Sequence, residues 1–165
     1  MAHTWLVQGL VDQVLLIGAE ESDWVAVEAT SYYHPDLKSS EGAGALLLSL
    51  AEKGLPLRHS SALAFHSEHE RAEKLRELPL AAAPICITSE SGIAILDEAE
   101  RAASLPGNAT TTLHPRQIIG ETMGAGGALQ LVLAAQLAAQ HQCTVNVALT
   151  GSLCAAYSAV VEAGG

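Results

Sequence analysis

The 165-residue sequence has few basic side chains, eight Lys and Arg against eighteen Asp and Glu, for a formal net charge of −10. Binding to nucleic-acid phosphates or to an anionic membrane requires a basic surface, so this shortage argues against both partners. The longest strongly apolar stretch, residues 125–139, contains Gln130 and Gln136 and falls short of the ~20 residues of a membrane-spanning helix. We expect this stretch to form a buried helix of a soluble protein.

The sequence also lacks the signals of secretion and of metal binding. Its N-terminus has neither a Lys/Arg-rich start nor a continuous apolar run, which predicts a cytoplasmic protein. Cys86, Cys143 and Cys154 are odd in number and form no CxxC pair, so neither a disulfide framework nor a zinc site is expected. His66 and His69 are spaced i, i+3 but do not form the HExxH pattern. We predict no metal and no cofactor.

The sequence has an excess of apolar residues. Hydrophobic residues make up 49% of it and charged residues only 16%, and the mean hydropathy is +0.26. This is an unusually apolar balance for a soluble monomer of this size. We therefore predict one domain over residues 1–165, with part of its surface covered by a partner.

Strand and helix patterns alternate along the chain, which predicts an α/β fold with parallel strands. The run at residues 12–18 is rich in Leu and β-branched residues, and we expect a strand buried on both faces. Residues 20–40 are irregular and polar, with a short helix or an extended stretch among them. The remaining predicted strands are 41–49, 57–65, 84–88, 110–113 and a closing hairpin of 145–149 with 159–162, and the predicted helices are 67–78, 95–103 and an apolar helix that ends at Gln140.

Four segments carry motifs in a definite order. Residues 9–20 read GLVDQVLLIGAE, residues 40–48 read SEGAGALLL, and residues 120–129 read GETMGAGGAL, while Asp97 and Glu100 form a D-x-x-E pair after a glycine turn. Each motif alone is a weak, glycine-rich signal. In this order they resemble the β-ketoacyl synthases and their chain-length-factor relatives, which have the thiolase fold.

The resemblance implies a partial thiolase-like α/β fold, a mixed sheet with helices packed on both faces. The matched motifs all follow the nucleophilic cysteine of a typical synthase. The resemblance therefore implies that the nucleophile is absent here, and that residues 2–9 are the end of the helix that would begin with that cysteine.

The resemblance also assigns three positions in the active site. In the elongating synthases two histidines, assisted by a lysine, activate decarboxylation and stabilise the oxyanion. This sequence has Ser89 and Glu121 at the histidine positions and Arg116 at the lysine position. An ionised carboxylate cannot donate a hydrogen bond to an oxyanion. We predict an ion pair between Arg116 and Glu121 and assign no confident catalytic residue.

Further positions line the cavity and its gate in the resemblance. They are Met123, Leu153 and Cys154, with Leu153 in place of a phenylalanine that gates the site in the family. Both Cys86 and Cys154 are expected to be buried, inert thiols, because no histidine motif accompanies them. His114 adjoins the site and is the histidine we single out for testing.

These features favour a catalytically inactive ketosynthase-like or chain-length-factor-like subunit of fatty acid or polyketide-type biosynthesis. The implied partner is a ketosynthase-type subunit in a hetero-oligomer, or a second copy, with an acyl carrier protein reached through the complex. One alternative is half of a split β-ketoacyl synthase, an acyltransferase whose cysteine lies on another chain. Another is an acyl-binding or scaffold protein. In each case we expect an assembly and not a stable monomer.

Overall fold

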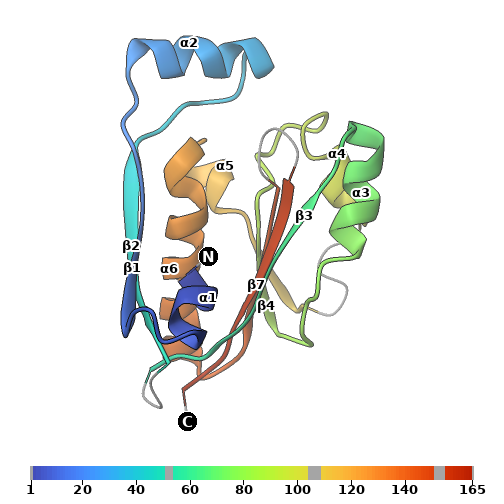
Figure 1. Cartoon of the computed structure of the whole chain (residues 1–165). Helices are drawn as coiled ribbons and strands as arrows, with labels where there is room; N and C mark the ends of the chain where they lie inside the picture. The colour runs from blue at the N-terminus through green and yellow to red at the C-terminus, as the bar shows by residue number, and fades with distance from the viewer. Residues whose placement is uncertain (1, 51–53, 104–108, 151–154, 165) are drawn as a thin grey trace.

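Two β-sheets lie on either side of one long helix, α6, which spans Gly126–His141 (Figure 1). The structure is a computed structural model that describes residues 2–50, 54–103, 109–150 and 155–164. The smaller sheet pairs β1 (Gln13–Glu20) with β2 (Gly42–Ser49) in antiparallel fashion. The larger sheet has the strand order β3-β7-β6-β4-β5. Because α6 contacts β1 and β2 on one side and β6 and β7 on the other, it forms the layer between the sheets.

The larger sheet is mixed. Its strands are β3 (Leu57–Ala64), β4 (Ile85–Thr88), β5 (Thr111–Leu113), β6 (Val145–Thr150) and β7 (Ala155–Val161). β4 runs parallel to β5 and β6, whereas β7 is antiparallel to β6 and β3. The antiparallel pair β6 and β7 confirms the predicted closing hairpin, although β7 begins earlier than residue 159.

Helices cover both faces of this sheet because successive strand residues point to opposite sides. In β4, Cys86 packs in a cluster with Leu75 and Ala103, whereas its neighbour Ile87 packs with Ala134 of α6. The first cluster lies under α3 (Glu68–Arg76) and α4 (Glu98–Ala103), on the side away from α6 (Figure 1). The predicted arrangement, a mixed sheet with helices on both faces, is confirmed.

Local signals set the helix boundaries. Ser67 caps α3 by accepting a hydrogen bond from the amide of Glu70, and Leu75 and Leu78 are buried, as the sequence predicts. The remaining helices are α1 (Ala2–Val7), α2 (Trp24–Tyr33), α5 (Pro115–Ile119) and the 3₁₀ turn η1 (Met123–Ala125). In the described part of the chain, no helix is long and apolar enough to cross a membrane.

The prediction that the strand at residues 12–18 is buried on both faces is wrong. β1 alternates between exposed and half-buried residues, and Leu15 and Ile17 are 59% and 64% exposed. The reason is that the β1 and β2 sheet packs against α6 with one face only, and no described element covers the other. An apolar run predicts a buried strand but does not say which element buries it.

The close contact between α6 and the small sheet depends on glycine. Gly18 and Gly44 are opposite each other in the strand register, and a Cβ atom on Gly44 would lie 2.9 Å from the backbone of Ala128 and Leu129. We expect Gly44→Ala to lower the free energy of unfolding by about 1–3 kcal/mol, as overpacking does. Urea denaturation tests this, with Ala45→Ser on the exposed face as control. Equal stability of the two variants would contradict the packing described here.

Candidate functional site

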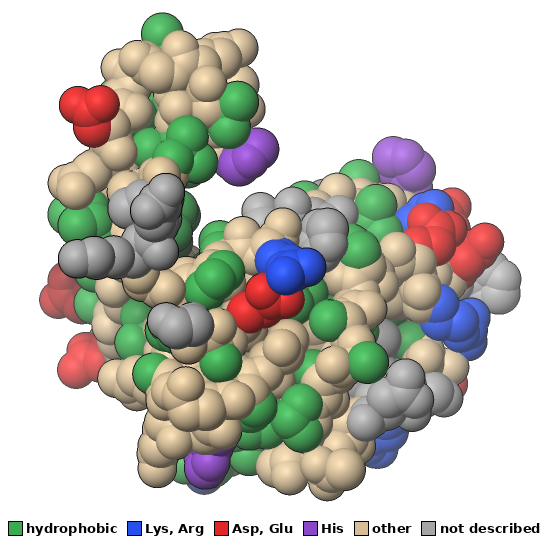
Figure 2. All heavy atoms as spheres, turned by 90° about the horizontal axis from the view of Figure 1, so that it is seen from below, with side chains coloured by type: hydrophobic (Ala, Val, Ile, Leu, Met, Phe, Trp, Pro, Cys, Tyr) green, Lys and Arg blue, Asp and Glu red, His purple; other side chains and the backbone are tan. Residues whose placement is uncertain are grey.

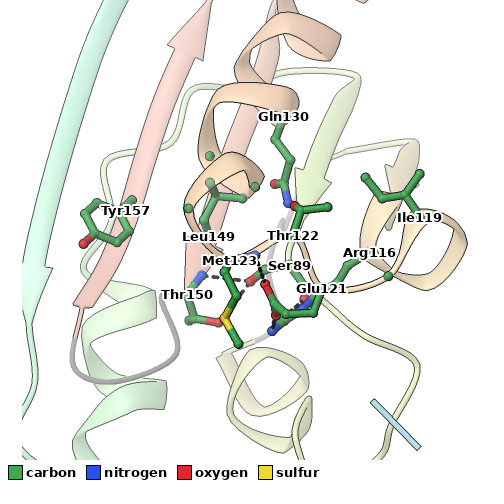
Figure 3. A pocket seen from close by; sticks show the side chains of 14 residues that line it. Ser89, Arg116, Ile119, Glu121, Thr122, Met123, Gln130, Leu149, Thr150 and Tyr157 are labelled. Carbon is green, nitrogen blue, oxygen red and sulfur yellow. Dashed lines mark hydrogen bonds and ion pairs between the residues drawn. The ribbon is translucent and has the colours of Figure 1, made fainter. Parts of the chain in front are cut away.

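A pocket of about 380 Å³ lies where α5, η1 and the start of α6 face strands β6 and β7 (Figure 3). Its lining includes four residues assigned from the sequence, Ser89, Arg116, Glu121 and Met123. The structure therefore brings Ser89, which follows β4, next to the continuous stretch that contains Arg116, Glu121 and Met123. Leu153 and Cys154, the other predicted cavity positions, lie outside the described residues.

Arg116 and Glu121, which both line the pocket, form an ion pair between Nη2 and Oε2. The other oxygen of Glu121 accepts a hydrogen bond of 2.9 Å from the amide of Met123, and Arg116 Nη1 donates one of 3.1 Å to the carbonyl of Ser89. Burial lowers the pKa of the Arg116 guanidinium from its ordinary value. The guanidinium stays charged because Arg does not lose its proton in proteins. Arg116 and Glu121, which the sequence resemblance places at the family's Lys and His positions, are therefore paired with each other and with the backbone.

The chain turns between these two residues at Gly120. Its φ is +86°, and a Cβ atom there would lie 2.8 Å from the carbonyl oxygen of Lys38. Only glycine fits this combination of left-handed backbone and close approach. The turn directs Glu121 back toward Arg116 on the preceding helix, so the local sequence itself builds the ion pair.

Ser89 belongs to a buried polar network beside that pair. Its hydroxyl lies 2.6 Å from Glu100 Oε1 and donates to it, and it accepts a hydrogen bond of 2.8 Å from the amide of Thr150. The Thr150 hydroxyl also donates to Glu100, and Arg71 Nη2 donates to Thr150 across 2.6 Å. Burial raises the pKa of Glu100 above its ordinary value, against the lowering effects of these hydrogen bonds and of Arg71. The Ser89 hydroxyl thus both donates and accepts a hydrogen bond within this network.

The D-x-x-E pair has a structural explanation. Asp97 is 2% exposed and accepts hydrogen bonds of 2.8 Å from the amides of Ser91 and Gly92, so it holds the glycine turn that follows β4. Glu100 lies one helical turn further on and therefore points at Ser89. The three-residue spacing of Asp97 and Glu100 therefore lets one short helix hold both the glycine turn and the polar network that includes Ser89.

Three residues of this site were not predicted from the sequence. They are Arg71 and Thr150, which belong to the buried network, and Gln130, which lines the pocket. They come from α3, β6 and α6. Arg71 and Thr150 are 79 positions apart in the sequence. No local motif joins them, so only the fold could place them together.

His114 lies next to the site but is not among the residues that line the pocket. Its Nδ1 atom is 2.7 Å from the Thr88 hydroxyl and 3.9 Å from a carboxylate oxygen of Glu90. His66 is exposed, and the side chain of His69 is not described. Within the described ranges, no three His, Cys, Asp or Glu side chains converge where they could hold a metal ion.

Cys86 should be inert toward alkylation in the folded protein. The side chain is fully buried, and burial raises the pKa of its thiol to about 12, so the reactive thiolate is scarce at neutral pH. Half-buried Cys143 is the internal comparison. We expect iodoacetamide to modify Cys143 well before Cys86, as measured by peptide mass spectrometry. Faster labelling of Cys86 would contradict this.

Comparison with known proteins finds the fold and not a close relative. No family model matches the sequence, and no curated protein matches it. A β-ketoacyl synthase from Burkholderia phymatum matches in structure with a TM-score of 0.82 and 14% identity, over 98% of this chain and 57% of the other. The ishigamide ketosynthase/chain length factor matches with a TM-score of 0.74 and 17% identity, over 99% and 52%.

A third match is a chain of a type II PKS acyl-carrier protein in complex with its ketosynthase. It has a TM-score of 0.76 and 15% identity, over 98% of this chain and 54% of that one. The chain therefore spans about half the length of the solved structures that it matches.

These matches define the class of fold, which is α/β and thiolase-like. More particularly, the chain has the fold of part of a ketosynthase, and the resemblance drawn from the sequence motifs is confirmed.

Proposed function

We propose that this chain is a catalytically inactive ketosynthase-like subunit that assembles with a partner chain in fatty acid or polyketide-type biosynthesis. The observation that carries the proposal is the ion pair of Arg116 with Glu121. A condensing site needs hydrogen-bond donors directed at the developing oxyanion. Here the pocket presents a carboxylate, which only accepts, and a guanidinium whose Nη1 and Nη2 atoms already pair with the Ser89 carbonyl and with this carboxylate.

Assembly is supported by the open face of the small sheet. Leu15, Ile17 and Leu47 are about three-fifths exposed on that face, and Trp24 and Tyr32 of α2 are 75% and 81% exposed. Exposed apolar patches of this kind mark sites of protein interaction. The face therefore supports a protein partner that buries it.

The charge of the same region favours a different chain over a second copy. Residues 13–49 carry one basic side chain, Lys38. Their acidic side chains are Glu20, Glu21, Asp23, Glu28, Asp36 and Glu41. In Figure 2 the described side chains on the left, where β1, β2 and α2 lie in Figure 1, include acidic and apolar groups, and the blue ones lie elsewhere. A basic rim on the partner would complement this face, whereas the same face of a second copy would add only Lys38 and six further acidic side chains.

The test of inactivity is acyl transfer. The chain, purified with its copurifying partner, is incubated with radiolabelled acyl-carrier protein, and each polypeptide is assayed for bound label. We expect no label on this chain. Acyl transfer to any of its residues would overturn the proposal.

The test of assembly is charge substitution on the open face. Ile17→Glu should abolish copurification with the partner, whereas Ile118→Glu, at an 88% exposed position on α5, should leave it intact. A folded 17.1 kDa monomer alone at micromolar concentration, measured by sedimentation, would contradict the need for a partner.

The split-enzyme alternative draws its support from the pocket, because a space of about 380 Å³ remains in which substrate could meet a cysteine from another chain. It predicts label on a partner cysteine, and loss of that labelling when Glu121 is replaced. Unchanged labelling in Glu121→Gln would favour the inactive subunit.

A further inference from the structure

Helix α2 (Trp24–Tyr33) has little to pack against in the described part of the chain. It lies beyond the ends of β1 and β2, apart from the two sheets (Figure 1). No other described helix or strand makes more than marginal contact with it. Among its described side chains Thr30 is buried and Ala26 is half-buried, and all the others are exposed. Only the side of the helix that carries these two residues is therefore covered.

The residues of α2 do not favour a helix that stands alone. Seven of its ten residues are Trp, Val, Thr, Ser or Tyr, which all have a lower helix propensity than Ala or Glu. Asp23 caps the first turn by accepting a hydrogen bond of 2.8 Å from the amide of Ala26. Isolated helices shorter than about 12–15 residues are nevertheless marginal in water. The helix needs packing that the described chain does not supply.

The exposed side of α2 carries the residue types that anchor protein interfaces. Trp24, Glu28 and Tyr32 are spaced four residues apart, so they form one row along the helix. At 3.6 residues per turn, this row lies opposite the two covered residues. Trp24 and Tyr32 are 75% and 81% exposed, and the Tyr32 hydroxyl donates a hydrogen bond of 3.3 Å to Glu28 Oε1. Two aromatic anchors with one carboxylate between them suit an apolar groove that holds a cation midway.

The charge of α2 and its flanks indicates the kind of partner. Residues 20–37 contain no Lys or Arg, and their acidic residues are Glu20, Glu21, Asp23, Glu28 and Asp36. An anionic membrane would repel this segment. The same helix of a second copy, laid along this one, would bring like charges together. A groove with basic side chains on a different protein complements them.

We propose that α2 is a docking helix, and that a different protein chain receives it in an apolar groove with a basic side chain opposite Glu28. The proposal rests on the assembly proposed above and names the element that docks. Trp24 and Tyr32 fill the groove, and the basic group neutralises Glu28 when water is excluded, because a carboxylate buried without a counter-ion would weaken the complex.

The experiment measures the affinity of the complex for variants of the full chain. Each variant is co-expressed with the partner that copurifies with the wild-type chain, and mass photometry of the diluted complex gives its Kd. We expect Trp24→Ala and Tyr32→Ala each to raise the Kd about 30-fold, as the loss of a buried aromatic anchor does. Glu28→Lys should raise it at least as much, because it sets two cations against each other.

Two control variants show whether these losses come from docking. Glu98→Lys makes the same change of charge at an exposed position of α4. Ile118→Ala removes an 88% exposed apolar side chain from α5. Both variants should leave the Kd unchanged, and losses equal to those of the α2 variants would overturn the proposal.

The outcomes also separate this proposal from the proposed function. If Ile17→Glu abolishes binding while Trp24→Ala and Tyr32→Ala leave the Kd unchanged, the partner binds the open sheet face alone, and only the docking helix is overturned. It is also overturned if the partner proves to be a second copy of this chain. Flotation of the chain with phosphatidylserine-containing vesicles, lost in Trp24→Ala, would assign the helix to a membrane instead. The absence of any partner would overturn both proposals.

Discussion

Replacing Arg116 with methionine should lower the free energy of unfolding by about 3–5 kcal/mol at neutral pH. Methionine retains the apolar stem and removes the charge. The side chain of Glu121 is 11% exposed, so its carboxylate would stay in the pocket wall without a counter-ion. The carbonyl of Ser89 would lose its donor as well. Urea denaturation followed by circular dichroism measures the change.

Two further variants separate the ion pair from general damage. Arg116→Met combined with Glu121→Met should recover much of the lost stability, since removing both charges leaves none buried and unpaired. Lys74→Met breaks an exposed ion pair with Glu77 and should change stability little, because solvent screens such pairs. If the Arg116 and Lys74 variants were equally destabilised, the pair in the pocket would not be the buried interaction described here.

The parts of the fold that the sequence predicts are those with local causes. Ser67 caps the start of α3. The glycine-rich motifs let α6 pack against the small sheet at Gly18 and Gly44, where any Cβ atom would meet the helix. The predicted ion pair of Arg116 with Glu121 also has a local cause, because its members are five positions apart across one glycine turn. In these cases the spacing of residues along the chain is enough to predict the contact.

The parts that the sequence does not predict depend on contacts between distant segments. One face of β1 is exposed because α6 packs on the other face and no described element covers this one. The apolar pattern that includes Leu15 and Ile17 does not show which face is covered. The network of Arg71, Glu100 and Thr150 joins α3, α4 and β6, and no spacing rule connects them. The sequence also does not show that the Oε1 atom of Gln130 is buried without a hydrogen-bond partner, because Gln130 is there one polar residue in an apolar helix.

In this site each charged side chain faces one of opposite charge: Arg116 pairs with Glu121, and Arg71 lies beside Glu100. Ser89 and Glu121 stand where the resemblance expects imidazoles. Ser89 is bound by Glu100, whose side chain is 3% exposed, and Glu121 by Arg116, whose side chain is 15% exposed. Introducing a histidine at one of these two positions would therefore leave the interactions of the other unchanged. Glu121→His alone should not create condensing activity, because Ser89 would remain bound to Glu100 and Arg116 would lose its counter-ion.

The buried carboxyl of Glu100 should make stability fall as pH rises. Burial raises its pKa in the folded protein above the ordinary value of 4.5. Between pH 4.5 and that raised pKa, the native state keeps a proton that the unfolded chain has lost, so unfolding releases a proton and becomes more favourable with rising pH. The slope from this group alone can reach about 1.4 kcal/mol per pH unit. Below both pKa values the group contributes no slope.

Glu100→Gln isolates this effect. Glutamine keeps the oxygen that accepts from Ser89 and Thr150 but does not ionise, and the lost attraction to Arg71 adds an offset. The stability of Glu100→Gln relative to the wild-type chain should therefore improve steadily as pH rises above 4.5 and then level off. Urea denaturation at successive pH values measures this difference, with Glu98→Gln on the exposed side of the same helix as control. A difference that stays constant with pH, or one that turns against glutamine as pH rises, would show that Glu100 is already ionised and fully compensated by Arg71, Ser89 and Thr150.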